Sequence, residues 1–354
     1  MRVLHAADFG GAAAGSFVPM IAALARRLRA RGDAFAFVVP RVEGARWYSD
    51  VRDAGAELHV VDGPSAAAAF ARAWRPDVAH VHFFGWEIPL TLRLWSSRAR
   101  VFWHAHSTSL RGGRLHPSPR TFAKYRLIAS RAERIVTVSD AVADELTALG
   151  APRARLLTIR NAIDTARFRP PAGDERAAAR ARLGLDERPA ILFFGRDPVL
   201  KGADVLLAAL EALPGTSVVS VAGTPETDAS LARHAQVVAV AWTDDVPSLM
   251  WACDVLAMPS RGEGFPLTLL EAASAGLPIV ASDLPALREA ARAGGAAQRT
   301  RFVAPGDGGA LRDALRAVLA APWHAREAVR NGAPDENALD AWAAEVCALY
   351  DRKR

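Results

Sequence analysis

Two glutamates separated by seven residues have the residue type and the setting that point most clearly to chemistry. They are Glu263 and Glu271, within the stretch Arg261–Ala281, RGEGFPLTLLEAASAGLPIVA. A helix that begins near Phe265–Leu267 would carry Glu271 inside it and leave Glu263 on the preceding loop. The first turn of such a helix offers unpaired backbone N–H groups and the positive end of the helix dipole, which suit a diphosphate. Carboxylates beside that anion can accept hydrogen bonds from sugar hydroxyls, so the stretch favours a nucleotide-sugar site.

A second stretch supplies two cations. Arg196 and Lys201 follow the predicted strand Ala190–Phe194 in the sequence FGRDPVLKG. Two cations at the carboxyl end of a parallel strand can neutralise a diphosphate leaving group without a metal ion. The chain has 41 arginines and only 3 lysines, which indicates that a compact ammonium is wanted at Lys201. The alternative is that both cations are solvated loop charges.

Histidines recur where predicted strands end. His80 and His82 close DVAHVH, and His104 and His106 close VFWHAH. Residues two apart on a strand point to the same face, so each pair is either a functional site or a pair of structural core histidines. No cluster of His, Cys, Asp or Glu has the spacing of a metal site, and we expect neither a metal nor another cofactor.

The order of elements predicts an α/β protein. Short apolar strands alternate with helical patterns, which is typical of parallel sheets. The first strand, Val3–Ala6, is followed by a glycine-rich turn that contains Gly10 and Gly11. We predict two Rossmann-like domains facing across a cleft, with ligands bound at the carboxyl ends of the strands. The expected boundaries are 1–168 for the first domain, 169–334 for the second and 335–354 for a closing helix.

Composition excludes several classes of protein. The 354 residues are 51% hydrophobic and 23% charged, with two cysteines, Cys253 and Cys347. Apolar stretches are interrupted well before the length of a membrane span, and the N-terminus lacks the pattern of a secretory signal. The length, the composition and the small number of cysteines exclude a secreted mini-protein, a zinc module and a disordered chain. The cysteine usage favours a reducing, cytoplasmic setting.

The positive charge is concentrated in the first half. Residues 1–169 hold 25 Lys and Arg against 14 Asp and Glu, and the stretch Arg93–Arg134 holds ten of these cations with Glu133 as its only acid. Trp86, Trp95 and Trp103 lie in or beside it. Such a surface could meet anionic lipid or a phosphorylated substrate, and the alternative is an arginine-rich solvated face. No nucleic-acid motif accompanies the charge, so we expect no nucleic-acid partner.

Taken together, these motifs carry a resemblance to a known family. In chain order they are GGAAAG, DVAHVH, VFWHAHST, AERIVTVSDAVADEL, RNAIDTARFRP, FFGRDPVLKG, AWTDDVPSLMWACDVLAMPS, EGFPLTLLEA and FVAPGD. The sequence resembles the family 4 (group 1) glycosyltransferases, which have the two-domain GT-B fold. The resemblance runs from about Val3 to Asp307 and includes the last helix, which the family's fold packs back toward the N-terminal domain.

The resemblance implies a reaction: transfer of a sugar from a nucleotide-diphosphate donor with retention of anomeric configuration, usually without a metal. The C-terminal domain would bind the donor, and the N-terminal domain the acceptor. Carried over by position, the family roles fall on a defined set: Arg196 and Lys201 on the diphosphate, Glu271 on the ribose, Glu263 on the donor sugar, Gly264, Phe265, Pro266 and Leu267 around the donor, Gly10 and Gly11 near the phosphates, and His106, with His104 as its competitor, beside the donor sugar.

The resemblance also suggests a setting and leaves alternatives. Trp242 and Asp245 occupy a loop that the family places near the nucleobase, although Trp242 could equally serve packing. The acceptor would be a glycan, a glycolipid or another molecule of cell-surface polysaccharide synthesis. The protein would be cytoplasmic, with its basic N-terminal domain peripheral to an anionic membrane face. The alternatives are a nucleotide-sugar epimerase of the same fold and a non-catalytic partner that binds a nucleotide or glycan.

Overall fold

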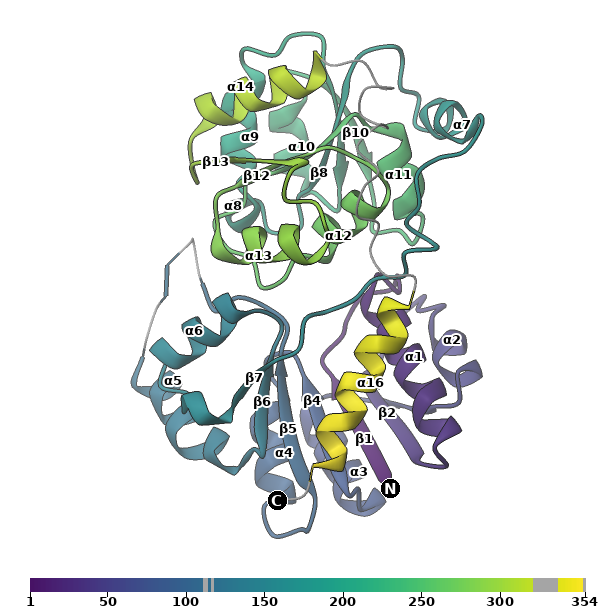
Figure 1. Ribbon diagram of the computed structural model, residues 1–354, viewed down its shortest axis with the longest axis vertical. Coiled ribbons are helices and arrows are strands. Elements are labelled where there is room, and N and C mark those ends of the chain that lie inside the picture. The colour runs from purple at the N-terminus through teal and green to yellow at the C-terminus, as the bar shows by residue number, and fades with distance from the viewer. Residues whose placement is uncertain (111–113, 116–117, 321–336, 353–354) are drawn as a thin grey trace. The chain divides into compact units, whose positions relative to one another are not determined.

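The computed structural model describes residues 1–110, 114–115, 118–320 and 337–352, and its contacts divide the chain into two units (Figure 1). Unit 1 comprises the described residues of Met1–Ser109, Leu115–Ala162 and Asn337–Arg354. Unit 2 comprises those of Leu110–Arg114 and Ile163–Glu336. The expected boundary between residues 334 and 335 lies outside the described residues.

Unit 1 is a parallel sheet with helices between its strands. Its strands are β1 (Arg2–Ala7), β2 (Ala34–Pro40), β3 (Glu57–Val61), β4 (Val78–His82), β5 (Arg100–Ala105), β6 (Arg134–Thr137) and β7 (Leu156–Thr158). Its helices are α1 (Phe17–Ala30), α2 (Tyr48–Asp53), α3 (Pro64–Trp74), α4 (Glu87–Leu94), α5 (Pro119–Ala123), α6 (Asp140–Ala148) and α16 (Ala338–Asp351), with short turns η1 (Lys124–Ile128), η2 (Ala129–Arg131) and η3 (Arg153–Arg155).

The strand order of unit 1 fixes where its strand ends meet. Among the described residues the sheet has seven parallel strands in the order β3-β2-β1-β4-β5-β6-β7. The order reverses between β1 and β4, and in open parallel sheets the loops at such a reversal diverge and leave a crevice at the strands' carboxyl ends. All residues of β4 are buried, which explains why its sequence VAHVH shows no alternation of apolar and polar residues.

Unit 2 repeats this architecture with its own core. Its strands are β8 (Ala190–Phe194), β9 (Ser217–Val221), β10 (Gln236–Val240), β11 (Val255–Met258), β12 (Ile279–Ser282) and β13 (Thr300–Val303). Its helices are α7 (Glu175–Arg182), α8 (Pro198–Lys201), α9 (Ala203–Leu210), α10 (Pro225–Leu231), α11 (Val246–Ala252), α12 (Leu267–Ser274), α13 (Pro285–Ala293) and α14 (Gly308–Leu319). In the described part of the chain its sheet is parallel, in the order β10-β9-β8-β11-β12-β13.

The last described helix returns to the first unit. The sequence predicts a helix over Asp335–Tyr350, and α16 spans Ala338–Asp351 and packs against α1 (Figure 1). Its buried side includes Trp342, Val346 and Tyr350. The predicted fold class, two Rossmann-like units and a C-terminal helix on the N-terminal unit, is confirmed by these elements. Within the described residues, we find no helix with the length and apolarity that crossing a membrane requires.

Candidate functional site

The candidate site in unit 2 lies where its strand order reverses. The reversal falls between β8 and β11, so the loops that follow these strands border the crevice expected of an open parallel sheet. The loop after β8 carries Arg196 and leads into α8, which ends at Lys201. The loop after β11 carries Glu263 and leads into α12. Both motifs singled out in the sequence therefore meet at one place in the fold.

Lys201 and Glu263 contact each other directly. The Lys201 ammonium donates to Glu263 Oε1 at 2.7 Å, and the Ser260 hydroxyl donates to the same oxygen at 2.7 Å. The Glu263 side chain is 8% exposed and that of Lys201 26% exposed, so the pair is largely withdrawn from solvent. A buried carboxylate needs such partners because desolvation of an unpaired charge is costly. The sequence predicted both residues, but not their bond or the part played by Ser260.

A network of hydrogen bonds joins the two loops that carry this pair. The backbone N–H of Arg261 donates to Leu200 O at 2.7 Å, and its guanidinium donates to Val199 O at 2.8 Å. The same guanidinium forms a two-pronged ion pair with Asp204 at 2.7 and 2.6 Å. This contact lowers the pKa of Asp204, chiefly through the hydrogen bonds from Arg261. Arg261 therefore fixes α8 and α9 against the loop of Glu263, a role the sequence analysis missed.

Gly202 allows the two loops to approach. Its φ is +72°, in the left-handed region, and a Cβ on it would lie 2.0 Å from the carbonyl oxygen of Pro259. Pro259 begins the loop after β11, so only a residue without a side chain fits between Lys201 and that backbone.

We expect Gly202→Ala to separate the Lys201–Glu263 pair, because backbone must move to relieve the clash. The unfolding free energy of unit 2 should fall by about 2 kcal/mol or more, given the strained φ and the steric overlap. Chemical denaturation followed by fluorescence measures this effect. Gly215→Ala is the matched control, since Gly215 also has a positive φ, +74°, but open space around it. Equal losses in the two variants would show that the close approach has no special role.

Helix α12 begins where the motif predicts. It starts at Leu267, with Pro266 at the capping position, and Glu271 lies about one turn inside it at 5% exposure. Gly264, Phe265 and Pro266 are buried, whereas Leu267 is partly exposed. Proline offers no N–H of its own, so the backbone donors of the first turn begin at Leu267. The helix thus presents its positive end on the same loop that holds Glu263.

Arg196 lies beside an exposed tryptophan. Its guanidinium is 5.6 Å from the ring centre of Trp242, which follows β10 and is 43% exposed. This exposure argues against the packing role left open for Trp242. An exposed flat ring next to a cation at the strand ends can stack on a planar group of a ligand.

In unit 1 three of the predicted histidines, His80, His82 and His106, belong to one hydrogen-bonded chain, and His104 lies outside it. His106 Nε2 lies 2.8 Å from His82 Nδ1, and His82 Nε2 lies 2.7 Å from His5 Nδ1. The chain continues from His5 Nε2 to the Tyr350 hydroxyl at 2.7 Å, and from there to His80 Nδ1 at 2.6 Å. It therefore runs from the end of β5 through β4 and β1 to α16. His5 and Tyr350 were not predicted from the sequence, since neither stands in a motif.

Burial keeps this network neutral. It lowers the pKa of His5 and of His106 to about 3, and it holds the pKa of His80, His82 and His104 well below the ordinary value. Each imidazole then carries a single N–H, so the chain can be ordered in only two directions. His80 Nε2 is buried with no hydrogen-bond partner among the described residues. Because buried N–H groups without an acceptor are rare, we assign the proton of His80 to Nδ1. His106 then accepts at Nε2 and carries its proton on Nδ1.

The structure separates the two competing histidines. His104 is 1% exposed, and neither ring nitrogen has a hydrogen-bond partner among the described residues. His106 follows the end of β5 and is partly exposed. His106 is thus the better placed of the two to reach a ligand, as the sequence analysis preferred.

The histidine rings stack rather than converge on a point. The nitrogens of His80, His82 and His104 lie within 4.8 Å of one another. The rings of His80 and His82 are nearly parallel, at 7°, and both nitrogens of His82 already take part in the chain. Metal ligands instead direct their lone pairs at one centre about 2 Å away. The arrangement fits a hydrogen-bonded network better than a metal site.

Gly10 and Gly11, which follow β1, differ in the space around them. A Cβ at Gly10 would meet no atom within 4 Å, whereas one at Gly11 would lie 3.1 Å from the Phe9 ring. Gly10 is exposed and neither residue has a positive φ, so the turn itself does not require glycine at either position. Open space at Gly10 is compatible with the close approach of a ligand to the backbone.

Comparison with known proteins places this arrangement in a family. The model of "Glycosyltransferase Family 4" matches residues 19–167, and that of "Glycosyl transferases group 1" matches residues 188–321. Curated relatives include two D-inositol 3-phosphate glycosyltransferases. One, from Salinispora arenicola, is 32% identical over 51% of this chain and 46% of its own length; the other, from Jonesia denitrificans, is 28% identical over 78% and 72%. The chain thus spans about half the length of the first of these relatives.

A solved structure shares the fold of both units. Anabaena Alr3699/HepE in complex with UDP and glucose is 16% identical, with a TM-score of 0.79 over 99% of this chain and 100% of that one. The family models cover both units, and the predicted family is confirmed. This chain belongs to the family 4 (group 1) glycosyltransferases and shares their GT-B fold.

Proposed function

We propose that this protein is a retaining glycosyltransferase that moves a sugar from a nucleotide-diphosphate sugar to a hydroxyl of an acceptor. The observation that carries the proposal is the Lys201–Glu263 pair at the strand reversal of unit 2, beside the start of α12. Cations, helix N–H groups and buried carboxylates are what a diphosphate flanked by two sugars requires. The related structure named as a complex with UDP and glucose supports a donor of this class.

The residues suggest how the donor would react. As the bond between the sugar and the diphosphate breaks, negative charge grows on the leaving phosphate. Arg196, Lys201 and the first N–H groups of α12 would stabilise that charge without a metal ion. Lys201 would turn from Glu263 to the phosphate, and the released Glu263 carboxylate would orient the donor sugar. Glu271 would hold the ribose.

Residues of the N-terminal unit would also contact the donor. His106, with its proton assigned to Nδ1, would offer a neutral N–H donor to the donor sugar, while Gly10 and Gly11 would approach the phosphates. We expect no strong general base, because in front-face retention the departing phosphate takes the acceptor proton. The D-inositol 3-phosphate glycosyltransferases among the relatives make a phosphorylated polyol the first acceptor to try.

Product analysis tests the proposal. Purified protein is incubated with UDP-, GDP- and ADP-sugars, first alone and then with inositol phosphates, simple glycosides and lipid-linked acceptors, and products are identified by NMR. We expect a glycoside that forms only when an acceptor is present and that keeps the donor's anomeric configuration. An isomerised sugar without acceptor would instead identify an epimerase. If the protein binds a nucleotide tightly but shows neither turnover nor slow hydrolysis of the donor, it is a binding protein.

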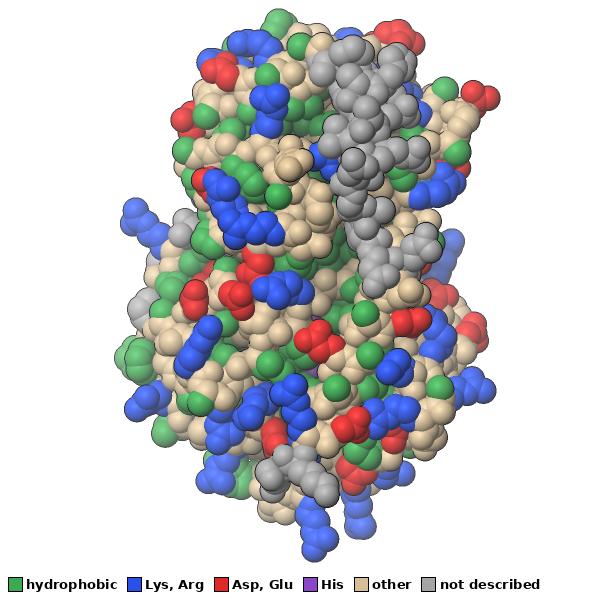
Figure 2. Space-filling view, in the orientation of Figure 1, with side chains coloured by type: hydrophobic (Ala, Val, Ile, Leu, Met, Phe, Trp, Pro, Cys, Tyr) green, Lys and Arg blue, Asp and Glu red, His purple; other side chains and the backbone are tan. Residues whose placement is uncertain are grey.

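We also propose that unit 1 binds an anionic membrane face, and an exposed surface of this unit supports that proposal. We define the α4–η1 surface by its exposed apolar residues, Leu92, Trp95, Phe122 and Leu127, which are 46–67% exposed. Exposed arginines surround them, namely Arg93, Arg98, Arg120, Arg126 and Arg131. The Arg131 guanidinium lies 4.0 Å from the centre of the Trp95 ring. Figure 2 shows basic and apolar side chains intermingled over the region where α4 and α5 lie in Figure 1. Apolar anchors ringed by cations are typical of proteins that bind an anionic bilayer surface.

We expect Leu127→Ser/Arg126→Gln to weaken binding to anionic vesicles by about tenfold or more, since it removes one apolar anchor and one cation. Cosedimentation with phosphatidylglycerol and phosphatidylcholine vesicles measures the effect. Val199→Ser/Arg182→Gln is the matched control, because it makes the same kinds of change at exposed residues of unit 2. Equal binding of the wild type to both lipids, or no binding at low salt, would remove the membrane proposal.

A further inference from the structure

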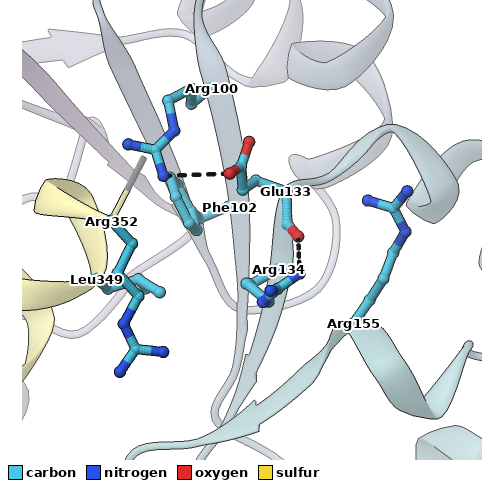
Figure 3. Close-up of a pocket in the computed structure, with 7 residues that line it drawn as sticks. All are labelled: Arg100, Phe102, Glu133, Arg134, Arg155, Leu349 and Arg352. Carbon is cyan, nitrogen blue, oxygen red and sulfur yellow. Dashed lines mark hydrogen bonds and ion pairs between the residues drawn. The ribbon is translucent and has the colours of Figure 1, made fainter. Parts of the chain in front are cut away.

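A recess at the other end of the unit 1 sheet is lined by arginines (Figure 3). It has a volume of about 290 Å³ and is lined by Arg100, Phe102, Glu133, Arg134, Arg155, Leu349 and Arg352. Arg100 and Arg134 begin β5 and β6, and Arg155 immediately precedes β7. The recess therefore lies at the amino ends of these strands. The candidate residues His106 and Gly10 follow carboxyl ends, so the recess is separate from them.

The charges of the recess are unbalanced. Four arginines and one glutamate line it, and the Glu133 carboxylate already accepts a hydrogen bond from Arg100 at 3.2 Å. Among the described residues that line the recess, the ion pair with Glu133 is made by Arg100, and Glu345 outside the lining interacts electrostatically with Arg352. Figure 3 shows the three arginines other than Arg100 arranged around the recess. Like charges held together in a concave site raise the local positive potential and favour an anion.

Three of the four arginines donate hydrogen bonds to backbone carbonyl oxygens and keep further N–H donors. Arg134 donates to Glu133 O at 3.1 Å, and Arg155 donates to Ala132 O at 2.5 Å. Arg100 donates to Tyr350 O at 2.7 Å near the end of α16. A guanidinium has five N–H donors, so each of these residues keeps donors for a ligand. This anchoring lowers the entropy lost when a ligand is bound.

We propose that this recess, the Arg100–Arg352 pocket, binds a phosphate group. Forked guanidinium donors match phosphate oxygens, and several arginines on one anion are typical of phosphate recognition. The phosphate could belong to a soluble phosphomonoester or to a lipid headgroup, since both offer the same oxygens. A bound anion would connect the ends of β5 and β6 to α16, which carries Tyr350 of the histidine chain.

Binding of inorganic phosphate to the full-length protein, followed by calorimetry and thermal shift, tests the proposal. Arg134→Gln/Arg155→Gln should weaken binding by about tenfold or more, and Arg352→Gln, which changes only an exposed side chain at the end of α16, should weaken it by a smaller factor. Arg46→Gln/Arg52→Gln removes the same charge at exposed positions of unit 1 and should bind phosphate like the wild type. Lys201→Gln should also bind normally, because it alters only the candidate donor site.

The outcomes separate this proposal from the proposed function. Unchanged phosphate binding in the Arg134/Arg155 double variant and in Arg352→Gln would overturn it. So would loss of binding in Lys201→Gln alone, which would place the anion at the donor site. If the pocket variants lose phosphate binding, vesicles identify the source. Loss of binding to phosphatidic acid vesicles in the same variants points to a headgroup, and retained vesicle binding points to a soluble phosphomonoester.

Discussion

Unit 1 is expected to unfold on mild acidification, at about pH 5. Five histidines cause this sensitivity: the buried His5, His80, His82 and His104, and the partly exposed His106. Burial lowers the pKa of every one of them in the folded state. The unfolded chain titrates near the ordinary histidine value of about 6.5, so below that pH it binds more protons than the folded chain does.

The sign and size of the effect follow from this difference. Stability falls as pH drops from about 6.5 toward the folded pKa of about 3 that burial gives His5 and His106. Each such histidine costs roughly 1 kcal/mol by about pH 5.5, and the five together cost on the order of 5 kcal/mol. That loss is comparable with the whole stability of an ordinary domain, about 5–15 kcal/mol.

Circular dichroism and tryptophan fluorescence against pH measure the transition. His104→Leu should move the midpoint to lower pH, because it removes one titrating group whose nitrogens have no hydrogen-bond partner among the described residues. His59→Gln, at a partly exposed histidine of β3, is the control and should leave the midpoint unchanged. A protein that stays folded below about pH 4 would contradict the neutral, buried state of the network.

Breaking the Lys201–Glu263 pair is expected to affect stability and turnover in different ways. Lys201→Gln leaves the buried Glu263 carboxylate without its cation, so unit 2 should lose stability, by up to about 3 kcal/mol. Adding Glu263→Gln removes the stranded charge and should restore much of that loss. The second substitution should not restore turnover. Both variants lose the ammonium that would stabilise the departing diphosphate, so kcat/KM should fall by about 10²-fold or more in each.

Denaturation curves and initial rates on the same preparations separate the two effects. Arg292→Gln removes a cation from an exposed position on α13 and should change neither quantity. Recovery of turnover along with stability in the double variant would show that Lys201 serves only to neutralise Glu263. Its assignment to the diphosphate would then be wrong.

The sequence predicted the fold well where strands are apolar throughout. Ala190–Phe194 was predicted with the bounds that β8 has. The strands β3 and β13 were missed. Each lies at an edge of its sheet, and their residues ELHVV and TRFV include charged or polar side chains that only a central strand must exclude.

The residues of the candidate site could be predicted where they stand in short sequence motifs. Glu263, Glu271, Arg196 and Lys201 stand in compact motifs, and the order of strands brings two of these motifs to one reversal. The histidine chain could be predicted only in part, because Tyr350 is 345 residues away from the His5 ring that it contacts. Contacts at such separations depend on which helix returns to which sheet, and local patterns in the sequence do not encode that.

The most direct test of the central claim is a calorimetric titration of UDP, GDP and ADP into the wild-type protein in buffer with a chelator. We predict that at least one of them binds with a stoichiometry near one. We also predict that Lys201→Gln weakens that binding by about tenfold or more while Arg292→Gln does not. Failure of all three nucleotides to bind, or equal affinity in the wild type and Lys201→Gln, would contradict the central claim.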